Sequence, residues 1–248
     1  IVDFTGSARF GAWVEQNAYP ALSYTETSGV NTVVLESMDD LESVARSLAT
    51  TMNLFSAQMC TSPQNIYVPR GGVTVGGRRV SVDEVCDAIV AAFRAVVAEP
   101  RRAASILATV QSPATLDLVG RMRDSGRRRG AVLLDSTPYA HPDFPAARTA
   151  TPLLLRVAPA ARDLYCEERF GPIGFVIETD DAASALESAA TDVRAAGGIT
   201  AFVYSQRDDF LAAAEAAYAT AGAQLTCNLT GAMPLNFAAS YSDYHVTG

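Results

Sequence analysis

The sequence contains no lysine, and all 19 of its positively charged side chains are arginines. This absence excludes chemistry that needs a lysine amine, such as a Schiff base with substrate or pyridoxal phosphate, and the phosphate-binding lysine of a P-loop. Histidine occurs only as His141 and His245. A multi-histidine metal site or a triad centred on histidine is therefore not expected, and we predict no bound metal.

Cysteines and long apolar runs are also scarce. The four cysteines, Cys60, Cys86, Cys166 and Cys227, form no CxxC pair, so we expect reduced thiols and no disulfide framework. No segment approaches the roughly 18 consecutive apolar residues of a membrane span. The net charge of −8 argues against nucleic acid as a partner, because phosphate binding needs excess positive charge. We expect a cytoplasmic protein with neither membrane nor nucleic acid as a partner.

With 49% hydrophobic and 19% charged residues in 248, the chain is globular and long enough to bury a core. Apolar periodicity predicts helices that alternate with short strands. The helices are expected at 12–17, 39–57, 81–99, 113–126, 181–196 and 206–221, and the strands at 1–4, 22–26, 31–35, 66–68, 131–134, 153–155, 174–177, 199–204 and 223–229. This alternation predicts an α/β fold with a mostly parallel open sheet and helices on both faces.

Three local patterns add detail to this prediction. The glycine pairs at 71–72 and 76–77 indicate a hairpin, and Pro100 is expected to end the preceding helix. The apolar runs at 131–134, 153–155 and 174–177 are typical of strands covered on both faces. The Pro-rich stretch 136–151 has no period and is expected to be a loop, and the last 20 residues are expected to form an extended tail.

Cys60 lies between a predicted helix and a predicted strand, where nucleophiles are often held, and a thiolate is a strong nucleophile. A buried free thiol is the alternative. Cys86 and Cys227 fall on apolar faces and are expected to be buried. Cys166 is followed by two glutamates, which would raise its pKa and make it a poor nucleophile.

Glu26 is the one carboxylate between Gln16 and Leu35. At the end of a strand and close to a glycine, it is a candidate general base or, alternatively, a turn cap. Residues 166–172 carry an acid and an aromatic ring that could bind a sugar hydroxyl and a flat ring, or could simply be solvated. Residues 6–11 form a glycine-containing turn that can present backbone N–H groups to a phosphate.

Taken in order, these four stretches resemble the aldehyde dehydrogenase superfamily. The family's phosphate loop is similar to Phe4-Thr5-Gly6-Ser7 with Gly11. Its Glu-Leu-Gly-Gly-Lys-Asn motif shares three residues with 26–31, although Val30 replaces the lysine. The catalytic Gln-x-Cys is matched by residues 58–60, with Cys60 34 positions after Glu26 and alanine replacing glycine at 57. The Glu-x-Phe-Gly-Pro motif is matched by residues 168–172.

The resemblance implies that Cys60 attacks an aldehyde carbonyl and that its backbone N–H helps to stabilise the alkoxide. Transfer of hydride to NAD or NADP would leave a thioester on Cys60, which water activated by Glu26 would hydrolyse to the acid. The cofactor would be held by five residues: Glu168 at the nicotinamide ribose, Phe170 beside the ring, and Gly6, Ser7 and Gly11 at the phosphate loop.

The same resemblance implies a division of the chain. Residues 1–30 would be the last edge of the dinucleotide-binding domain, 31–228 the catalytic domain, and 229–248 a C-terminal return segment. We therefore expect this chain to be the C-terminal portion of a larger two-domain enzyme, inactive alone and homo-oligomeric in its full-length form.

The motifs around Glu26 and Cys60 look most like those of the phenylacetate-degradation semialdehyde dehydrogenases. An alternative is the coenzyme-A-acylating branch, because residues 60–64 have its Cys-x-Ser-x-Gln pattern. A third possibility is a non-catalytic assembly module that keeps the fold.

Overall fold

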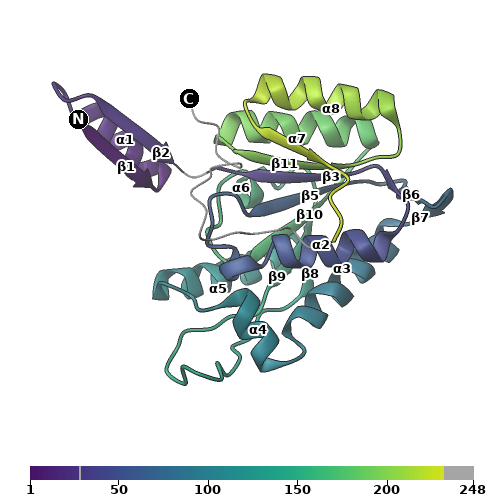
Figure 1. Cartoon of the computed structure of the whole chain (residues 1–248), viewed down its shortest axis with the longest axis horizontal. Coiled ribbons are helices and arrows are strands. Elements are labelled where there is room, and N and C mark those ends of the chain that lie inside the picture. The colour runs from purple at the N-terminus through teal and green to yellow at the C-terminus, as the bar shows by residue number, and fades with distance from the viewer. Residues whose placement is uncertain (28, 232–248) are drawn as a thin grey trace.

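The computed structural model describes residues 1–27 and 29–231. The chain begins with a small unit made of β1 (Val2–Gly6), α1 (Ala8–Asn17) and β2 (Ser23–Thr27). Its two strands pair in parallel, and α1 packs on them. Figure 1 shows this unit beside one end of the main body.

A seven-stranded sheet forms the centre of the body, in the order β12-β11-β3-β5-β10-β9-β8. Within this described sheet all neighbours are parallel except β8 and β9. The prediction of a mostly parallel sheet is therefore confirmed. Its strands are β3 (Asn31–Leu35), β5 (Pro63–Pro69), β8 (Gly130–Leu134), β9 (Leu153–Val157), β10 (Ile173–Thr179), β11 (Thr200–Tyr204) and β12 (Gln224–Cys227).

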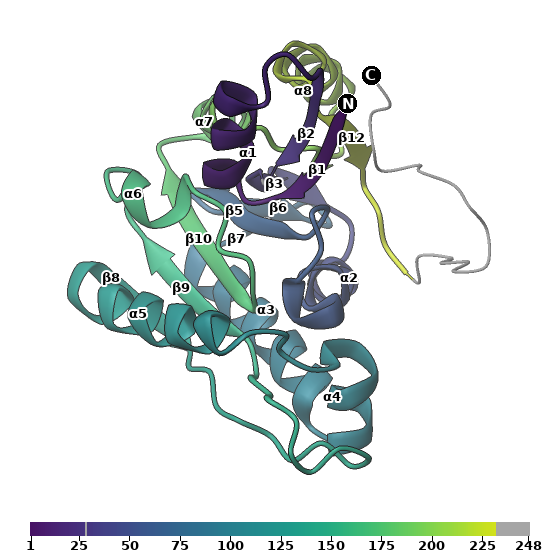
Figure 2. The ribbon, with the colours of Figure 1, turned by 90° about the vertical axis from the view of Figure 1, so that its left-hand side faces the viewer.

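Helices cover both faces of this sheet, as predicted. One apolar cluster joins alternate strand residues to α2 (Leu41–Thr51) and α3 (Val82–Val97). The other joins the opposite strand faces to α5 (Pro113–Arg129), α6 (Arg162–Tyr165), α7 (Ala182–Ala196) and α8 (Asp208–Ala221). Figure 1 shows α7 and α8 on the face opposite α2 and α3, and Figure 2 shows α5 running beside β8 and β9.

A small three-stranded sheet joins β4 (Ser37–Met38) to the hairpin of β6 (Val73–Val75) and β7 (Arg78–Val80). Gly76 and Gly77 form the hairpin turn with φ of 53° and 80°. Two successive positive φ angles suit the tight turn between antiparallel strands. The hairpin predicted from its glycines is confirmed.

The helix predicted over 39–57 is wrong at its C-terminal end. It stops at Thr51, and a short turn, Leu54–Ala57, follows. Phe55, Ser56 and Ala57 have φ of 53°, 56° and 50°. Such left-handed angles cost roughly 1–2 kcal/mol for each non-glycine residue. Apolar periodicity carries no information about the sign of φ. The segment also contains no glycine that would indicate a left-handed turn.

Two further expectations are corrected. Pro100 does not simply end a helix: it occupies the first turn of α4 (Pro100–Leu107), where its missing N–H is tolerated. The strand at 131–134 is not covered on both faces, since β8 is the antiparallel edge strand and is only partly buried.

Of the tail expected at 229–248, residues 232–248 lie outside the described residues. The loop expected at 136–151 contains neither helix nor strand. In the described ranges, every helix is too short or too polar to traverse a lipid bilayer.

Candidate active site

The candidate residues of the large sheet gather at the amino ends of its parallel strands. Cys60 precedes β5, and Phe170 lies in the loop before β10. Asn31 begins β3, and Thr200 begins β11. Since β3, β5, β10 and β11 include three pairs of parallel neighbours, their amino ends meet along one edge. Folding thus brings together segments that are more than 100 residues apart.

The side-chain amide of Asn31 fixes the Cys60 loop to this edge. Its Nδ2 donates to the carbonyl oxygens of Cys60 at 2.7 Å and Ser62 at 3.1 Å. Its Oδ1 accepts from the N–H groups of Ile199 at 2.9 Å and Thr200 at 3.0 Å. Only 1% of Asn31 is exposed. One buried amide therefore connects β3, the Cys60 loop and the start of β11.

Gln58 supports the left-handed turn that precedes Cys60. Its Nε2 donates to the carbonyls of Phe55 and Thr109, each at 2.9 Å, and its Oε1 accepts from the N–H of Gln111 at 2.8 Å. Ser56 Oγ donates to the carbonyl of Leu107 at 2.7 Å. These contacts with residues 107–111 oppose the cost of the positive φ angles and hold Cys60 on a rigid turn.

The side chain of Cys60 is half-buried, neither in the protein core nor fully exposed. Burial raises the pKa of its thiol above 9.0, and the nearby carboxylates of Glu26 and Glu168 raise it further. The backbone N–H groups of Cys60 and Thr61 oppose this by favouring the thiolate. The net effect of these groups favours the protonated thiol over the thiolate.

The two carboxylates that influence this cysteine, Glu26 and Glu168, come from different parts of the chain. On β2, Thr25 and Thr27 face α1, since a Cβ on Gly11 would lie near both side chains. Side chains alternate along a strand, so Glu26 points away from α1, and it is exposed. Glu168 lies in the loop between α6 and β10 and is partly exposed. The structure thus brings together the three predicted residues Cys60, Glu26 and Glu168.

Of the predicted phosphate-loop residues, Gly6 and Ser7 are exposed and Gly11 is buried. Gly6 ends β1, and Ser7 caps α1 with its Oγ accepting from the N–H of Phe10 at 3.4 Å. Both are exposed at the start of the ten-residue α1. Gly11 is instead buried in the body of α1, where a Cβ would lie 2.3 Å from Thr27 Cγ2. Its role in the structure is to let α1 approach β2.

These positions fit the parts of a dinucleotide. Exposed N–H groups at a helix start suit a pyrophosphate, and a carboxylate such as Glu168 accepts hydrogen bonds from ribose hydroxyls. Phe170 is 42% exposed, so its ring is available to pack against a flat heterocycle instead of anchoring the loop in the core.

The other cysteines differ from Cys60. Cys86 is buried as predicted, and burial raises the pKa of its thiol to about 11. The pKa of Cys166 is raised to about 12, in the predicted direction, but by burial and then by Asp192, not by the following glutamates. Cys227 was expected to be buried and is exposed.

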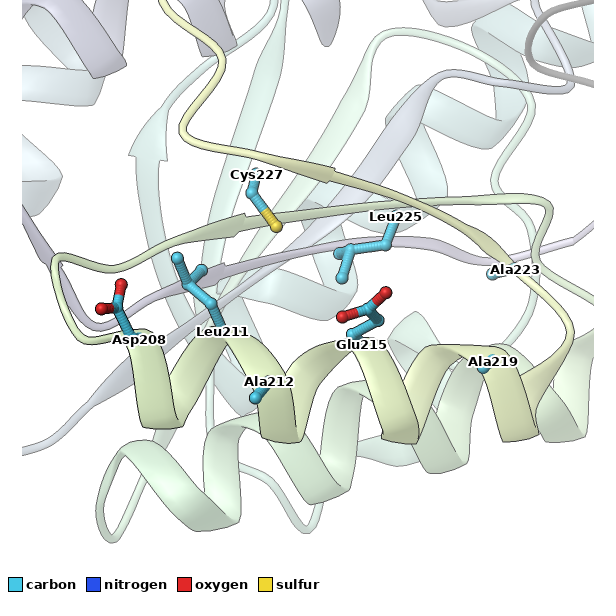
Figure 3. Close-up of a pocket in the computed structure, with 8 residues that line it drawn as sticks. All are labelled: Asp208, Leu211, Ala212, Glu215, Ala219, Ala223, Leu225 and Cys227. Carbon is cyan, nitrogen blue, oxygen red and sulfur yellow. The ribbon is translucent and has the colours of Figure 1, made fainter.

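Cys227 lines a groove of about 620 Å³ between β12 and α8 (Figure 3). The helix presents the small Ala212 and Ala219 and the acidic Asp208 and Glu215 there, so the strand end stays uncovered. The groove lies at the sheet edge formed by β12, and Cys60 is not among its lining residues.

The acylating interpretation relied partly on Gln64. In the structure this side chain is buried and hydrogen-bonded to protein backbone. It is therefore not displayed to a thiol substrate, and its presence does not favour the acylating branch. Asn31, Gln58 and Gln64 were visible in the motifs, but their scaffolding contacts with distant backbone had no local sequence signal.

Comparisons with known proteins identify the family to which the chain belongs. Residues 1–234 match the aldehyde dehydrogenase family model. The structure of an NAD-dependent aldehyde dehydrogenase from Burkholderia multivorans is 42% identical, with a TM-score of 0.88, over 93% of this chain and 41% of that one. The present chain thus spans less than half the length of that relative.

Two further structures support the fold alone. Gamma-glutamyl-gamma-aminobutyraldehyde dehydrogenase from Burkholderia cenocepacia is 22% identical, with a TM-score of 0.73, over 92% of this chain and 44% of that one. HpcC from Thermus thermophilus is 18% identical, with a TM-score of 0.74, over 95% and 44%. No curated protein matches the chain. The family match over residues 1–234, together with the 42% identical structure, shows that the chain belongs to the aldehyde dehydrogenase family.

Proposed function

We propose that the protein to which these residues belong oxidises an aldehyde to the corresponding acid, with Cys60 as nucleophile and a nicotinamide dinucleotide as hydride acceptor. The observation that carries this proposal is that two carboxylates, Glu26 and Glu168, lie near enough to Cys60 to raise the pKa of its thiol. An accessible thiol with a nearby base and backbone donors can perform acyl chemistry.

In the first step the Cys60 sulfur bonds to the aldehyde carbon, and the thiol proton passes to a base. Because the pKa of the thiol is raised, its proton is lost to water as the sulfur attacks, and the carboxylate of Glu26 is kept for the later hydrolysis. The N–H groups of Cys60 and Thr61, which already favour negative charge on sulfur, lie where they can also stabilise the substrate alkoxide.

When bound, the dinucleotide supplies an oxidised nicotinamide ring that takes the hydride from the substrate carbon. The thioester left on Cys60 is then attacked by water, and Glu26 removes the proton from that water. The carbon–sulfur bond breaks, and the acid leaves. Glu168 would orient the cofactor ribose, Phe170 would confine the ring, and Gly6 and Ser7 would approach the pyrophosphate.

The narrower parts of the proposal rest on resemblance. The motifs at 26–31 and 58–63 favour a semialdehyde of aromatic, phenylacetate-type catabolism as substrate. The 42% identical relative is named as NAD-dependent, which favours NAD over NADP. We further propose that the complete protein is a cytoplasmic homo-oligomer.

The test uses the complete protein that carries these residues, with a panel of aromatic and aliphatic semialdehydes. Cys60→Ala should abolish NAD reduction, whereas Cys227→Ala, which changes an exposed thiol away from the site, should leave it unchanged. Glu26→Gln should keep a burst of reduced cofactor and slow release of the acid. Normal steady-state turnover by Glu26→Gln would remove Glu26 from the role of base, and normal turnover by Cys60→Ala would refute the proposed mechanism.

A further inference from the structure

Gln64 is the second residue of β5 and lies four residues after Cys60. Only 6% of it is exposed. A buried amide needs partners for both its N–H groups and its oxygen, because an unpaired polar group in the interior costs free energy. The partners of Gln64 lie about 100 residues further along the chain.

These partners surround Glu168. Gln64 Nε2 donates to the carbonyl oxygens of Tyr165 at 3.0 Å and Glu167 at 3.3 Å. Gln64 Oε1 accepts from the N–H of Arg169 at 2.6 Å. The Glu167 carbonyl and the Arg169 N–H belong to the two peptide groups that flank Glu168. A single side chain therefore holds the backbone on both sides of this carboxylate.

Neighbouring contacts make the same loop rigid. Asn65 Nδ2 donates to the carbonyl of Tyr165 at 3.0 Å. The guanidinium of Arg169 donates to the carbonyls of Leu164 at 2.9 Å and Asp163 at 2.6 Å. The arginine contacts bind the loop to α6, whereas Gln64 and Asn65 bind it to β5, the strand that begins just after Cys60.

We propose that Gln64 is a positioning residue, which fixes the backbone on both sides of Glu168 to β5 and thereby sets the place of the Glu168 carboxylate relative to the Cys60 sulfur. This inference rests on the proposed function in that Glu168 is taken to bind the cofactor ribose. Only three residues lie between Cys60 and Gln64, so one short stretch of backbone connects the two parts of the site. Small misplacements of reacting groups are costly in rate.

Glutamine is suited to this position because it offers a donor and an acceptor at one side-chain length. Methionine has similar length and neither function. Glutamate keeps the acceptor for the Arg169 N–H but has no N–H for the two carbonyls. The variants Gln64→Met and Gln64→Glu therefore separate the two halves of the contact.

The first measurement is amide hydrogen exchange on the 248-residue chain. Exchange at the Arg169 N–H should accelerate about tenfold in Gln64→Met, the size expected for one hydrogen bond, and should stay slow in Gln64→Glu. The control is Thr179→Val, which removes a buried hydroxyl at the other end of β10, bonded to the carbonyl of Asp181 at 3.0 Å. It should leave Arg169 exchange unchanged. Equal protection of Arg169 in wild type and Gln64→Met would overturn the inference.

The second measurement uses the complete protein and its steady-state kinetics. Gln64→Met should raise KM for NAD about tenfold with a smaller change in kcat, as Glu168→Gln should. The double variant should be no worse than Glu168→Gln alone, because both changes act on one group. Additive effects would show that Gln64 does not act through Glu168 and would overturn the inference.

The two measurements separate this inference from the proposed function. If the wild-type protein reduces no NAD with any aldehyde, the proposed function fails, and the role of Gln64 at the ribose fails with it. The exchange data then still decide whether Gln64 holds the loop. If the wild-type protein is active and Gln64→Met has normal kinetics and normal exchange, the inference alone fails.

Discussion

Gly29 gives a sharp test of how the site is assembled. A Cβ at this position would lie 2.2 Å from the carbonyl oxygen of Gly197 and 2.8 Å from the Cα of Gly198. Reciprocally, a Cβ on Gly198 would lie 2.2 Å from the carbonyl oxygen of Val30. The two backbones therefore touch directly, next to Asn31, whose amide joins the Cys60 loop to the start of β11.

Gly29→Ala should destabilise the fold by about 3 kcal/mol. Inserting a methyl group into a tightly packed place costs typically 1–3 kcal/mol, and here the opposing atoms are backbone, which cannot rotate away as a side chain can. For a chain of this size, about 1 kcal/mol shifts Tm by about 2–4 °C, so Tm should fall by about 6–12 °C.

Gly120→Ala is the matched control, with the opposite expected sign. Gly120 lies inside α5, and a Cβ there would meet nothing within 4 Å. Replacing a glycine by alanine inside a helix stabilises by roughly 0.5–1 kcal/mol, so Tm should rise by about 1–4 °C.

Urea and thermal unfolding of the 248-residue chain measure both variants. The rate at which iodoacetamide alkylates Cys60 reports on the site, and it should change in Gly29→Ala and stay constant in Gly120→Ala. If Gly29→Ala matched the wild type in both stability and alkylation, the direct backbone contact would be refuted.

Three other perturbations test the charges and thiols. Alkylation of Cys60 should accelerate as pH rises through 9 and beyond. At a fixed pH below 9, Glu26→Gln should also accelerate it, because removing that carboxylate lowers the pKa of the thiol. An unchanged rate in Glu26→Gln would contradict the electrostatic influence of Glu26 on Cys60. The free energy of unfolding should decrease between pH 9 and 11, since Cys86 ionises near 9.0 when unfolded and about 11 when folded; a variant Cys86→Ala should show a shallower decrease in urea titrations at several pH values. Asp192→Ala should lower the free energy of unfolding by about 3 kcal/mol, because the fully buried carboxylate accepts from Tyr67 Oη at 2.5 Å and pairs with Arg162. A decrease below about 1 kcal/mol in urea unfolding would mean that these contacts contribute little to stability.

Local periodicity was sufficient for most of the fold. The helices predicted over 81–99 and 181–196 are both present, as α3 and α7, and each begins with a capping box. The apolar strands at 31–35 and 174–177 lie in the sheet as β3 and β10. In these segments the local preferences and the tertiary packing agree, so short-range pattern is a reliable guide.

Prediction failed where contacts from distant residues decide the conformation. The left-handed turn at 55–57 contradicts its own residue types, and it forms because Gln58 and Ser56 bond to backbone at 107–109. Cys227 looked like a core residue on an apolar strand, yet the small side chains of α8 leave it exposed. Neither outcome has a signal within a short window of sequence.

The arrangement of the site follows from placing the parallel small sheet head to tail with the mostly parallel large sheet. Ligands of parallel sheets usually bind beyond the carboxyl ends of the strands, and Gly6 and Glu26 lie at the carboxyl ends of β1 and β2. Cys60 and Phe170 instead precede β5 and β10, at the amino edge of the large sheet. The carboxyl edge of the small unit thus faces the amino edge of the large one, so neither sheet alone holds both Glu26 and Cys60. The separation between Glu26 and Cys60 depends on the backbone contact at Gly29 and Gly198, and for this reason a single methyl group there should disturb both the stability of the fold and the reactivity of the thiol.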